Sequence, residues 1–521
     1  MTHSLPQALP VQTSGEIRFE VPLSLAGSVE SATETVEPSA ELLMAMRRAQ
    51  QLWSARALRE RLSVVRRFRE MLADDCASVS TTMGRNTNCL PAEIVASQIM
   101  PLLDACRFLE RSASKNLRTR SLGANRRPLF LWGVRGRVRR DAHGIVLIIA
   151  PSNYPLFLPG VQALQALVAG NAVLLKPGNG GNETARILAN LLSRAGLPPN
   201  GFHLLPEAPD SARAVINIGV DKVVFTGAAP TGVSILQQLA PHLTPAIMEL
   251  SGCDAVIVRA DADLGLVARA IAFGLRLNAG ETCIAPRRIF VPEQLATELE
   301  GRLAATFDAL PDLPLSQKQR DNARRIAAQS LTRGAHLVVG NVTSEEDFRA
   351  PMIIAGVPPD SPLLNEDYFA PIATLITVRD DEEALKRVAA CPYALGVSIF
   401  SRDMKAAEQM GSRIHAGVLT INDLIAPTAD PRLPFGGRGR SGFGVTRGAE
   451  GLLDMTVPKV ILRRTGALRL HYAPLNKSHT EGFAAFARLA HAGHWKTRLR
   501  ALWQLIRLRG RHCSDKEVKQ S

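Results

Sequence analysis

Short apolar runs alternate with helix-like stretches through the middle of the chain. The runs are rich in Val, Ile and Leu and cover residues 145–149, 172–175, 202–205, 222–225 and 246–250. Segments with apolar residues at helical spacing fall between them, at residues 162–168, 183–195, 212–218 and 232–239. Successive parallel strands need a crossover, which is usually a helix. The alternation therefore predicts a parallel α/β sheet with helices on both faces.

The same alternation returns further along the chain. Apolar runs at residues 255–258, 288–291, 337–339, 373–378 and 397–400 read as strands, and residues 264–277 read as a helix. No short-period repeat is visible, so a repeat array is not indicated. We therefore expect a second α/β unit after the first.

The segments before and between these units have different patterns. Leu42, Leu43 and Met46 recur at helical spacing, and residues 41–120 as a whole are predicted to be helical. Residues 126–140 place apolar side chains among arginines and glycines, which fits an exposed two-stranded ribbon and a basic surface loop equally well. Residues 1–38 are rich in Ser, Thr, Pro and Glu, which predicts a loosely held arm.

The C-terminal segment, residues 465–521, mixes apolar and basic residues. The apolar set is Phe483, Phe486, Leu489, Trp495, Leu499, Leu502, Trp503, Ile506 and Leu508, and the basic set is Lys496, Arg498, Arg500, Arg507, Arg509 and Arg511. This pattern predicts a basic amphipathic helix or helix pair. Such a segment could lie on an anionic membrane surface, dock on its own protein or pack on a partner subunit. Nucleic acid is not an expected partner, because no groove-reading or base-stacking module is recognisable.

Composition narrows the class of protein. The 521 residues are 46% hydrophobic and 21% charged, which is typical of a globular protein with two or three domains. No apolar run is long enough to span a membrane, and the N-terminus lacks the pattern of a signal peptide. The seven cysteines form no CxxC pair, so we expect a reducing compartment and no metal site. The predicted location is cytoplasmic, with the inner face of a membrane as a further option, because the net charge of +14 is concentrated toward the tail.

Cys283 and Glu249 are the strongest candidates for chemistry. Cys283 ends the segment NAGETC, and Glu249 lies in MELSG, thirty-four residues upstream. A thiol and a carboxylate beside glycine-containing turns suggest a covalent nucleophile and a general base. A free cysteine is more often a small buried apolar residue, and that alternative stands for Cys283 when it is taken alone.

Three more segments follow predicted strands and fit the same chemistry. Asn153, in PSNYP, would stand at the carboxyl end of the first strand, where its amide could stabilise an oxyanion or simply shape a turn. Lys176, in LLKPG, could bond a nucleotide ribose or phosphate, although most lysines are only surface residues. The segment FTGAAPTG, residues 225–232, joins a strand to a helix and suits a pyrophosphate, but it is a weak motif by itself.

Together these segments resemble the aldehyde dehydrogenase superfamily. The resemblance runs from about residue 40 to about residue 464 and includes two later motifs, NEDYFAP at residues 365–371 and LPFGGRGRSGFG at residues 433–444. All motifs stand in the order found in that superfamily, which makes the set specific although each motif is weak. The resemblance implies a Rossmann-type coenzyme domain, an α/β catalytic domain and a bridging β-ribbon used for oligomerisation.

The resemblance also implies a mechanism and a cofactor. Cys283 would attack an aldehyde, Asn153 and the Cys283 backbone N–H would hold the oxyanion, and Glu249 would activate the water that hydrolyses the thioester. NAD or NADP would take the hydride. The implied cofactor contacts are Pro151, Ser152, Lys176, Asn179, Thr226, Gly227, Ala228, Leu250, Asp367 and Phe369.

Several positions depart from the pattern of the superfamily. Asn179 replaces the usual ribose-binding Glu, which removes repulsion toward a 2′-phosphate and makes NADP an expected cofactor beside NAD. Ala228 replaces a serine at the pyrophosphate, and Asp367 replaces a longer Glu. Glu281 replaces a Gln and puts a second acid near the thiol, while Ser152 replaces an aromatic residue beside Asn153 and would widen the substrate channel.

The expected domains follow from the same resemblance. They are a flexible arm at 1–39, a coenzyme domain at 40–122 and 145–250, a catalytic domain at 251–425, bridging strands at 123–144 and 426–464, and the basic extension at 465–521. The expected partners are a small aldehyde, an apolar one if the tail binds a membrane, and a second copy of the chain in a homodimer or tetramer. Two rival functions are an enzyme that passes the acyl group to coenzyme A and a non-catalytic, membrane-associated member. The retained Glu249 argues against the first, and the joint presence of Asn153, Glu249 and Cys283 argues against the second.

Overall fold

The computed structural model describes residues 35–517, except for 87–88, 124–126, 129–130, 132, 344–346, 466–471, 473–474 and 476. The expected N-terminal arm and part of the expected ribbon, including Leu129, lie largely outside these residues. The described chain divides into two compact units. Unit 1 comprises residues up to 120 and 138–460, and unit 2 comprises residues 121–137 and 461–521.

The first sheet of unit 1 confirms the α/β fold class. Its six strands run in the order β17-β7-β6-β3-β4-β5, all parallel except β17. The strands are β3 (Ile145–Ile149), β4 (Ala172–Lys176), β5 (Phe202–Leu204), β6 (Lys222–Gly227), β7 (Ala246–Leu250) and β17 (Gly442–Phe443). The β3 strand is buried along its whole length, as expected for a parallel strand covered on both faces.

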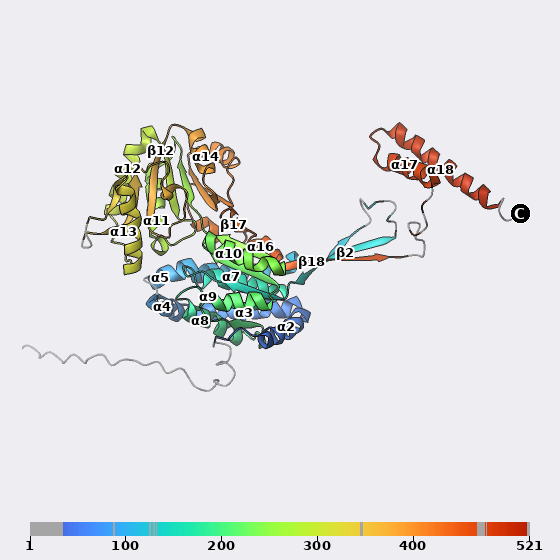
Figure 1. Cartoon of the computed structure of the whole chain (residues 1–521), viewed down its shortest axis with the longest axis horizontal. Coiled ribbons are helices and arrows are strands. Elements are labelled where there is room, and N and C mark those ends of the chain that lie inside the picture. Colours follow the sequence, from blue (N-terminus) through green and yellow to red (C-terminus); the bar gives the residue numbers. More distant parts are fainter. Residues whose placement is uncertain are drawn as a thin grey trace, which may run out of the picture. The chain divides into compact units, whose positions relative to one another are not determined.

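Helices cover both faces of this sheet (Figure 1). They are α2 (Ala40–Ala55), α3 (Leu58–Asp74), α4 (Cys76–Asn86), α5 (Pro91–Ile94), α6 (Met100–Asn116), α7 (Phe157–Ala169), α8 (Asn182–Arg194), α9 (Pro209–Ile218), α10 (Ala229–Leu239) and α16 (Gly448–Asp454). A π-helix, η1 (Val95–Ile99), joins α5 to α6. One apolar core forms under α3, α6, α7 and α8, and a second forms under α2, α9 and α10. The predicted helical region at residues 41–120 is therefore confirmed as far as Asn116 for the described residues, whereas Arg120 begins strand β1 (Arg120–Leu122).

The second sheet of unit 1 has seven strands in the order β10-β11-β12-β9-β8-β14-β15. They are β8 (Asp254–Val258), β9 (Pro286–Pro292), β10 (His336–Asn341), β11 (Arg349–Ala355), β12 (Ile372–Val378), β14 (Gly396–Phe400) and β15 (Val418–Ile421), and only β10 is antiparallel to its neighbour. The covering helices are α11 (Leu264–Arg276), α12 (Glu293–Asp308), α13 (Gln317–Leu331), α14 (Asp381–Ala389) and α15 (Met404–Gly411). Short 3-10 helices and one small strand pair, β13 (Tyr393–Ala394) with β16 (Arg438–Gly439), complete the unit.

The remaining strands form a three-stranded sheet in the order β1-β2-β18. They are β1 (Arg120–Leu122), β2 (Val134–Ala142) and β18 (Thr456–Arg464). The β2 strand lies in the segment for which a ribbon and a loop were equally expected, so the strand alternative holds there. In unit 2, helices α17 (Lys477–His491) and α18 (Trp495–Glu517) pack on each other (Figure 1). Within the described residues, no helix has the length and apolar content needed to cross a membrane.

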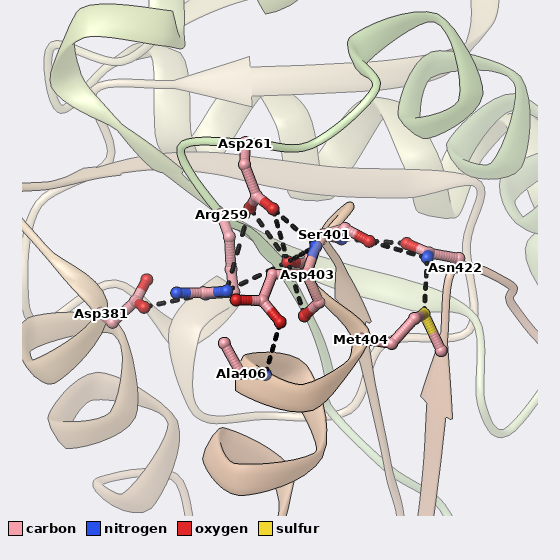
Figure 2. A network of polar contacts seen from close by, with 8 residues as sticks. All are labelled: Arg259, Asp261, Asp381, Ser401, Asp403, Met404, Ala406 and Asn422. Atoms are coloured by element: carbon pink, nitrogen blue, oxygen red, sulfur yellow. Dashed lines mark hydrogen bonds and ion pairs between the residues drawn. The ribbon is translucent and has the colours of Figure 1, made fainter.

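A polar network ties three strand ends of the second sheet together. Figure 2 shows Ser401 at its centre, after β14. The Ser401 hydroxyl lies 2.9 Å from both carboxylate oxygens of Asp261 and accepts from Arg259 Nη1 at 3.0 Å. Arg259 Nε also binds Asp381 at 2.9 Å, and the amide of Asn422, after β15, pairs with the Ser401 backbone. The carboxyl ends of β8, β14 and β15 are thus held by partly buried side-chain bonds, at the end of the sheet opposite the amino end of β9.

We expect Ser401→Ala to lower the free energy of unfolding by about 1–3 kcal/mol, because it removes a buried hydroxyl and leaves the partly buried Arg259 and Asp261 each short of a hydrogen bond. Urea unfolding followed by circular dichroism measures the loss. Ser412→Ala, which removes an exposed hydroxyl that bonds only the Gln409 carbonyl, is the matched control and should change stability by less than about 0.5 kcal/mol. Equal free energies of unfolding in the two variants would show that the hydrogen bonds of Ser401 do not contribute to stability.

Candidate active site

The carboxyl end of the first sheet meets the amino end of the second at one cavity of about 400 Å³. The predicted residues that line it are Pro151, Ser152, Asn153, Lys176, Asn179, Thr226, Gly227, Ala228, Glu249, Cys283, Asp367 and Phe369. Leu250 is the exception, because its buried side chain packs toward Gly232, where an added Cβ would lie 2.8 Å from Leu250 Cδ2. A contact from Leu250 to a cofactor stays a prediction.

Cys283 is placed by an unusual turn after α11. Asn278, Ala279 and Gly280 have consecutive φ values of 50°, 53° and 72°, all in the left-handed region. Gly280 has no room for a side chain, since an added Cβ would lie 2.6 Å from Pro371 Cα. The buried Arg287 donates to the Gly280 carbonyl at 2.8 Å and so fixes the turn from β9. The thiol is therefore carried by a strained, firmly held loop at the amino end of β9.

Glu249 lies near the end of β7 and is 3% exposed. Its Oε2 accepts bonds from Gln162 Nε2 at 3.3 Å, Thr226 Oγ1 at 3.4 Å and Thr446 Oγ1 at 3.3 Å. Its Oε1 is buried and has no protein partner, which leaves one oxygen available to a water. Burial raises the pKa of the Glu249 carboxyl, while Arg447 and the three donors lower it.

Asn153 follows β3 and points its amide into the turn that carries the thiol. Its Nδ2 donates to the Glu281 carbonyl at 2.7 Å, and Asn278 Nδ2 donates to the Asn153 carbonyl at 2.9 Å. An amide nitrogen has two protons, so the second proton of Asn153 Nδ2 can reach another acceptor. Asn153 is thereby fixed relative to the segment that contains Cys283.

Charged groups around Cys283 act in opposite directions. Burial raises the pKa of the Cys283 thiol, and the carboxylates of Glu249, Asp254 and Asp367 raise it further, whereas Arg447 lowers it. Glu281, the second acid expected near the thiol, also has a raised pKa because it is buried. The ionised thiol therefore needs support from a positive charge or from a ligand.

The cavity fits a dinucleotide on the side of the first sheet. The α10 helix begins beside it, and its N-cap Ala228 provides no side-chain bond, so the backbone N–H groups of the first turn can meet a phosphate. Gly178 allows the loop after β4 to approach Pro151, since an added Cβ would lie 2.3 Å from the Pro151 carbonyl. Lys176 is half-buried and lines the cavity, which suits a ribose or phosphate.

Sequence reasoning missed several residues of the site. Gln162 lies in α7, a wholly buried helix whose only polar side chains are Gln162 and Gln165, and a polar side chain in such a helix needs a partner. Thr446 and Arg447 lie two and three residues beyond Gly444, where the reading of the glycine-rich motif stopped. Glu207 had no signal, but it raises the pKa of Lys176 and accepts from Asn182 Nδ2 at 2.8 Å. Burial lowers the pKa of Lys176 and outweighs the effect of Glu207.

A second cavity of about 800 Å³ shares Ser152, Asn153 and Asn179 with the first. Its apolar lining comes from Leu90, Phe273, Leu277, Leu310, Leu313 and Pro314. Arg269, Arg276, Glu93 and Glu281 are the charged residues on its walls. The volume lies in the range of ligand sites.

Comparisons with known proteins agree with this geometry. A profile described as "Aldehyde dehydrogenase family" matches residues 21–461. The chain is 34% identical over 334 residues to a succinate-semialdehyde dehydrogenase [NADP(+)] of Deinococcus radiodurans, covering 61% of this chain and 69% of that one. It is 29% identical over 451 residues to a 4,4'-diapolycopene aldehyde oxidase of a Methylomonas species, covering 84% of each chain.

A solved structure extends the likeness to three dimensions. The Mycobacterium tuberculosis aldehyde dehydrogenase complexed with NAD+ is 27% identical, with a TM-score of 0.76 over 82% of this chain and 90% of that chain. The expected fold class, reaction class and cofactor class are thereby confirmed. The chain belongs to the aldehyde dehydrogenase family and is an NAD(P)-dependent oxidoreductase that converts an aldehyde to its carboxylic acid.

Proposed function

We propose that Cys283 is the nucleophile, Glu249 the base and Asn153 the oxyanion donor of this reaction. The observation that carries the assignment is that one cavity brings all three residues together from different elements. The thiolate sulfur of Cys283 bonds to the aldehyde carbon, and the carbonyl oxygen becomes an oxyanion beside the Asn153 amide and the Cys283 backbone N–H. When bound, NAD(P)+ accepts the hydride that leaves this carbon.

Loss of the hydride leaves a thioester on Cys283. Glu249 then takes a proton from a water at its unpartnered Oε1, and the hydroxide that results attacks the thioester carbon. The C–S bond breaks, the acid is released, and Cys283 regains a thiolate. The three bonds to Oε2 hold the carboxylate in one orientation while this happens.

We propose that the aldehyde approaches from the second cavity, because that cavity meets the cofactor cavity at Asn153. Its apolar walls favour an apolar aldehyde, and the small Ser152 leaves room beside the oxyanion donor. One relative is named for 4,4'-diapolycopene aldehyde and another for succinate semialdehyde, so the names alone do not choose a substrate.

We propose that NADP is accepted at least as well as NAD. Asn179 carries no charge to repel a 2′-phosphate, and Lys176 lines the same cavity. Glu207, near Lys176, is the carboxylate that opposes this preference.

We propose that a second copy of the chain covers the β18 edge, in a homodimer or a pair of dimers. The β18 strand ends the sheet order and exposes Val457, Val460, Ile461 and Leu462 by 43–68%. An exposed apolar edge strand is a site for pairing with another chain.

We propose that α17 and α18 bind an anionic membrane surface, which would place the enzyme near apolar aldehydes. Small residues make the contact between the two helices, since Ala485 and Ala501 are the buried ones. The large apolar side chains are left exposed at 41–66%, namely Phe483, Trp495, Leu499, Leu502, Trp503 and Ile506. Exposed basic residues interleave with them, at Arg488, Lys496, Arg498, Arg500 and Arg507. The free thiols among the described cysteines suit the cytoplasmic side that we expect for this surface.

We expect Cys283→Ala to abolish oxidation, while Glu249→Gln should still form the thioester and hydrolyse it slowly. Glutamine keeps the shape of the side chain but cannot accept the proton of water. Rapid mixing with an aldehyde should show a burst of reduced cofactor followed by slow turnover in Glu249→Gln, with and without coenzyme A. Full activity of Cys283→Ala would refute the assignment, and rescue of Glu249→Gln by coenzyme A would favour acyl transfer.

We expect Asn179→Glu to weaken NADP binding at least tenfold relative to NAD, because it adds a negative charge near the 2′-phosphate. Glu207→Gln should instead strengthen NADP binding relative to NAD binding. Titration of protein fluorescence with the reduced cofactors measures both dissociation constants without turnover. If the ratio of the NADP and NAD dissociation constants were unchanged in both variants, the proposed preference would be contradicted.

We expect truncation after Arg464 to remove binding to anionic vesicles and to leave the oligomeric state unchanged, since β18 ends at Arg464. Binding of the full chain should weaken as salt shortens the screening length to roughly 3 Å at 1 M. Co-sedimentation with phosphatidylserine vesicles tests the first part, and light scattering tests the second. Equal vesicle binding by both proteins, or by neither, would favour a helix pair docked on protein.

A further inference from the structure

Arg447 lies between β17 and α16 in a backbone conformation that arginine rarely adopts. Its φ of 62° and ψ of 175° fall in a region that is occupied almost only by glycine. The backbone N–H donates to Gln165 Oε1 at 3.3 Å, and Nη1 donates to the Thr428 carbonyl at 2.5 Å. A strained conformation held by such contacts at an active site points to a role for the side chain.

The guanidinium is buried beside the reacting groups. Arg447 is 5% exposed, and its Nε is buried without a protein partner. Its central carbon lies 4.3 Å from the ring centroid of Phe435 and 5.6 Å from that of Phe157. Phe435 belongs to the small apolar cluster against which Cys283 packs. The residue before Arg447, Thr446, donates to Glu249 Oε2.

Burying a guanidinium with an unpartnered nitrogen is costly unless the charge acts on something nearby. The two aromatic faces offset part of that cost. Burial lowers the pKa of Arg447, and Glu249 and Cys283 raise it, so both residues interact favourably with the charge.

The surroundings of the thiol explain why a cation is needed there. Glu249 faces it from β7, Asp254 from β8 and Asp367 from the loop before β12, and each carboxylate opposes a thiolate. Arg287 counters Asp254, Asp367 and Glu281 from β9. Arg447 is the cation whose charge acts on both Cys283 and Glu249.

We propose that Arg447 is a positioning residue whose buried positive charge favours the thiolate form of Cys283 and the carboxylate form of Glu249. The proposal rests on the assigned roles of those two residues. The charge of Arg447 opposes the burial and the neighbouring carboxylates that raise the two pKa values, so the nucleophile and the base ionise at lower pH than they would without it.

The test is the pH dependence of alkylation of Cys283 by iodoacetamide, without cofactor and read by peptide mass spectrometry. Arg447→Met removes the charge, and Arg447→Lys keeps it; both retain a Cβ and so the same backbone strain. Arg440→Met is the matched control, because Arg440 lies seven residues before Arg447, is exposed, and stacks over the Tyr393 ring. We expect the midpoint to rise by at least one pH unit in Arg447→Met, by less in Arg447→Lys and not at all in Arg440→Met.

A second measurement tests the effect of Arg447 on the ionisation of Glu249. Hydrolysis of the thioester needs ionised Glu249, so its rate falls as the pH drops through the pKa of that carboxyl. Loss of the cation should move this fall to higher pH in Arg447→Met. Unchanged profiles in both measurements, in a variant with normal thermal stability and cofactor binding, would overturn the proposal. Turnover by Cys283→Ala would instead overturn the underlying assignment, and the alkylation profile distinguishes the two failures.

Discussion

The arrangement of the site centres on an ionisable carboxyl held inside the protein, with burial and hydrogen bonds acting on its pKa in opposite directions. Glu249 is almost fully buried, and burial alone favours its protonated form. Three donors from α7, β6 and the segment after β17 oppose this tendency. Those donors can meet only if the first sheet, the buried helix α7 and the C-terminal glycine-rich segment are all in place. Folding of distant parts of the sequence is thus a condition for the chemistry of one side chain.

Much of the architecture could be predicted because it follows from local pattern. The five parallel strands of the first sheet were expected from their apolar runs, and the ends of β3, β4, β6 and β7 carry residues of the cofactor cavity. The β11 and β15 strands were missed. The β15 strand is half-exposed and short, and β11 contains Pro351 and a mixed start, so neither gives a clear run. The second sheet contributes to the cavity from the amino ends of its strands. Ligand sites in open α/β sheets are expected at the carboxyl ends, so this arrangement could not be predicted.

Residue types and spacing pointed to Cys283, Glu249 and Asn153 as candidates, but not to the groups that contact or influence them. Gln162, Thr446 and Arg447 act through contacts between elements far apart in sequence, and only the folded chain reveals those contacts. Glu207 shows the same limit for predicting cofactor preference. The sequence shows that position 179 lacks a carboxylate, but only the folded chain shows that Glu207 lies near Lys176. The strained turn at Asn278 and Ala279 could not be predicted from residue propensities either. Both residues have positive φ values, which favour glycine, and neither is glycine.

The backbone of Arg447 has an evolutionary consequence. A glycine at that position would adopt the same φ and ψ without strain and would relieve roughly 1–3 kcal/mol. Random mutation under selection for abundance alone would therefore drift toward glycine there. Under the role proposed for Arg447, selection on turnover opposes that drift, and activity and stability favour different residues at this position.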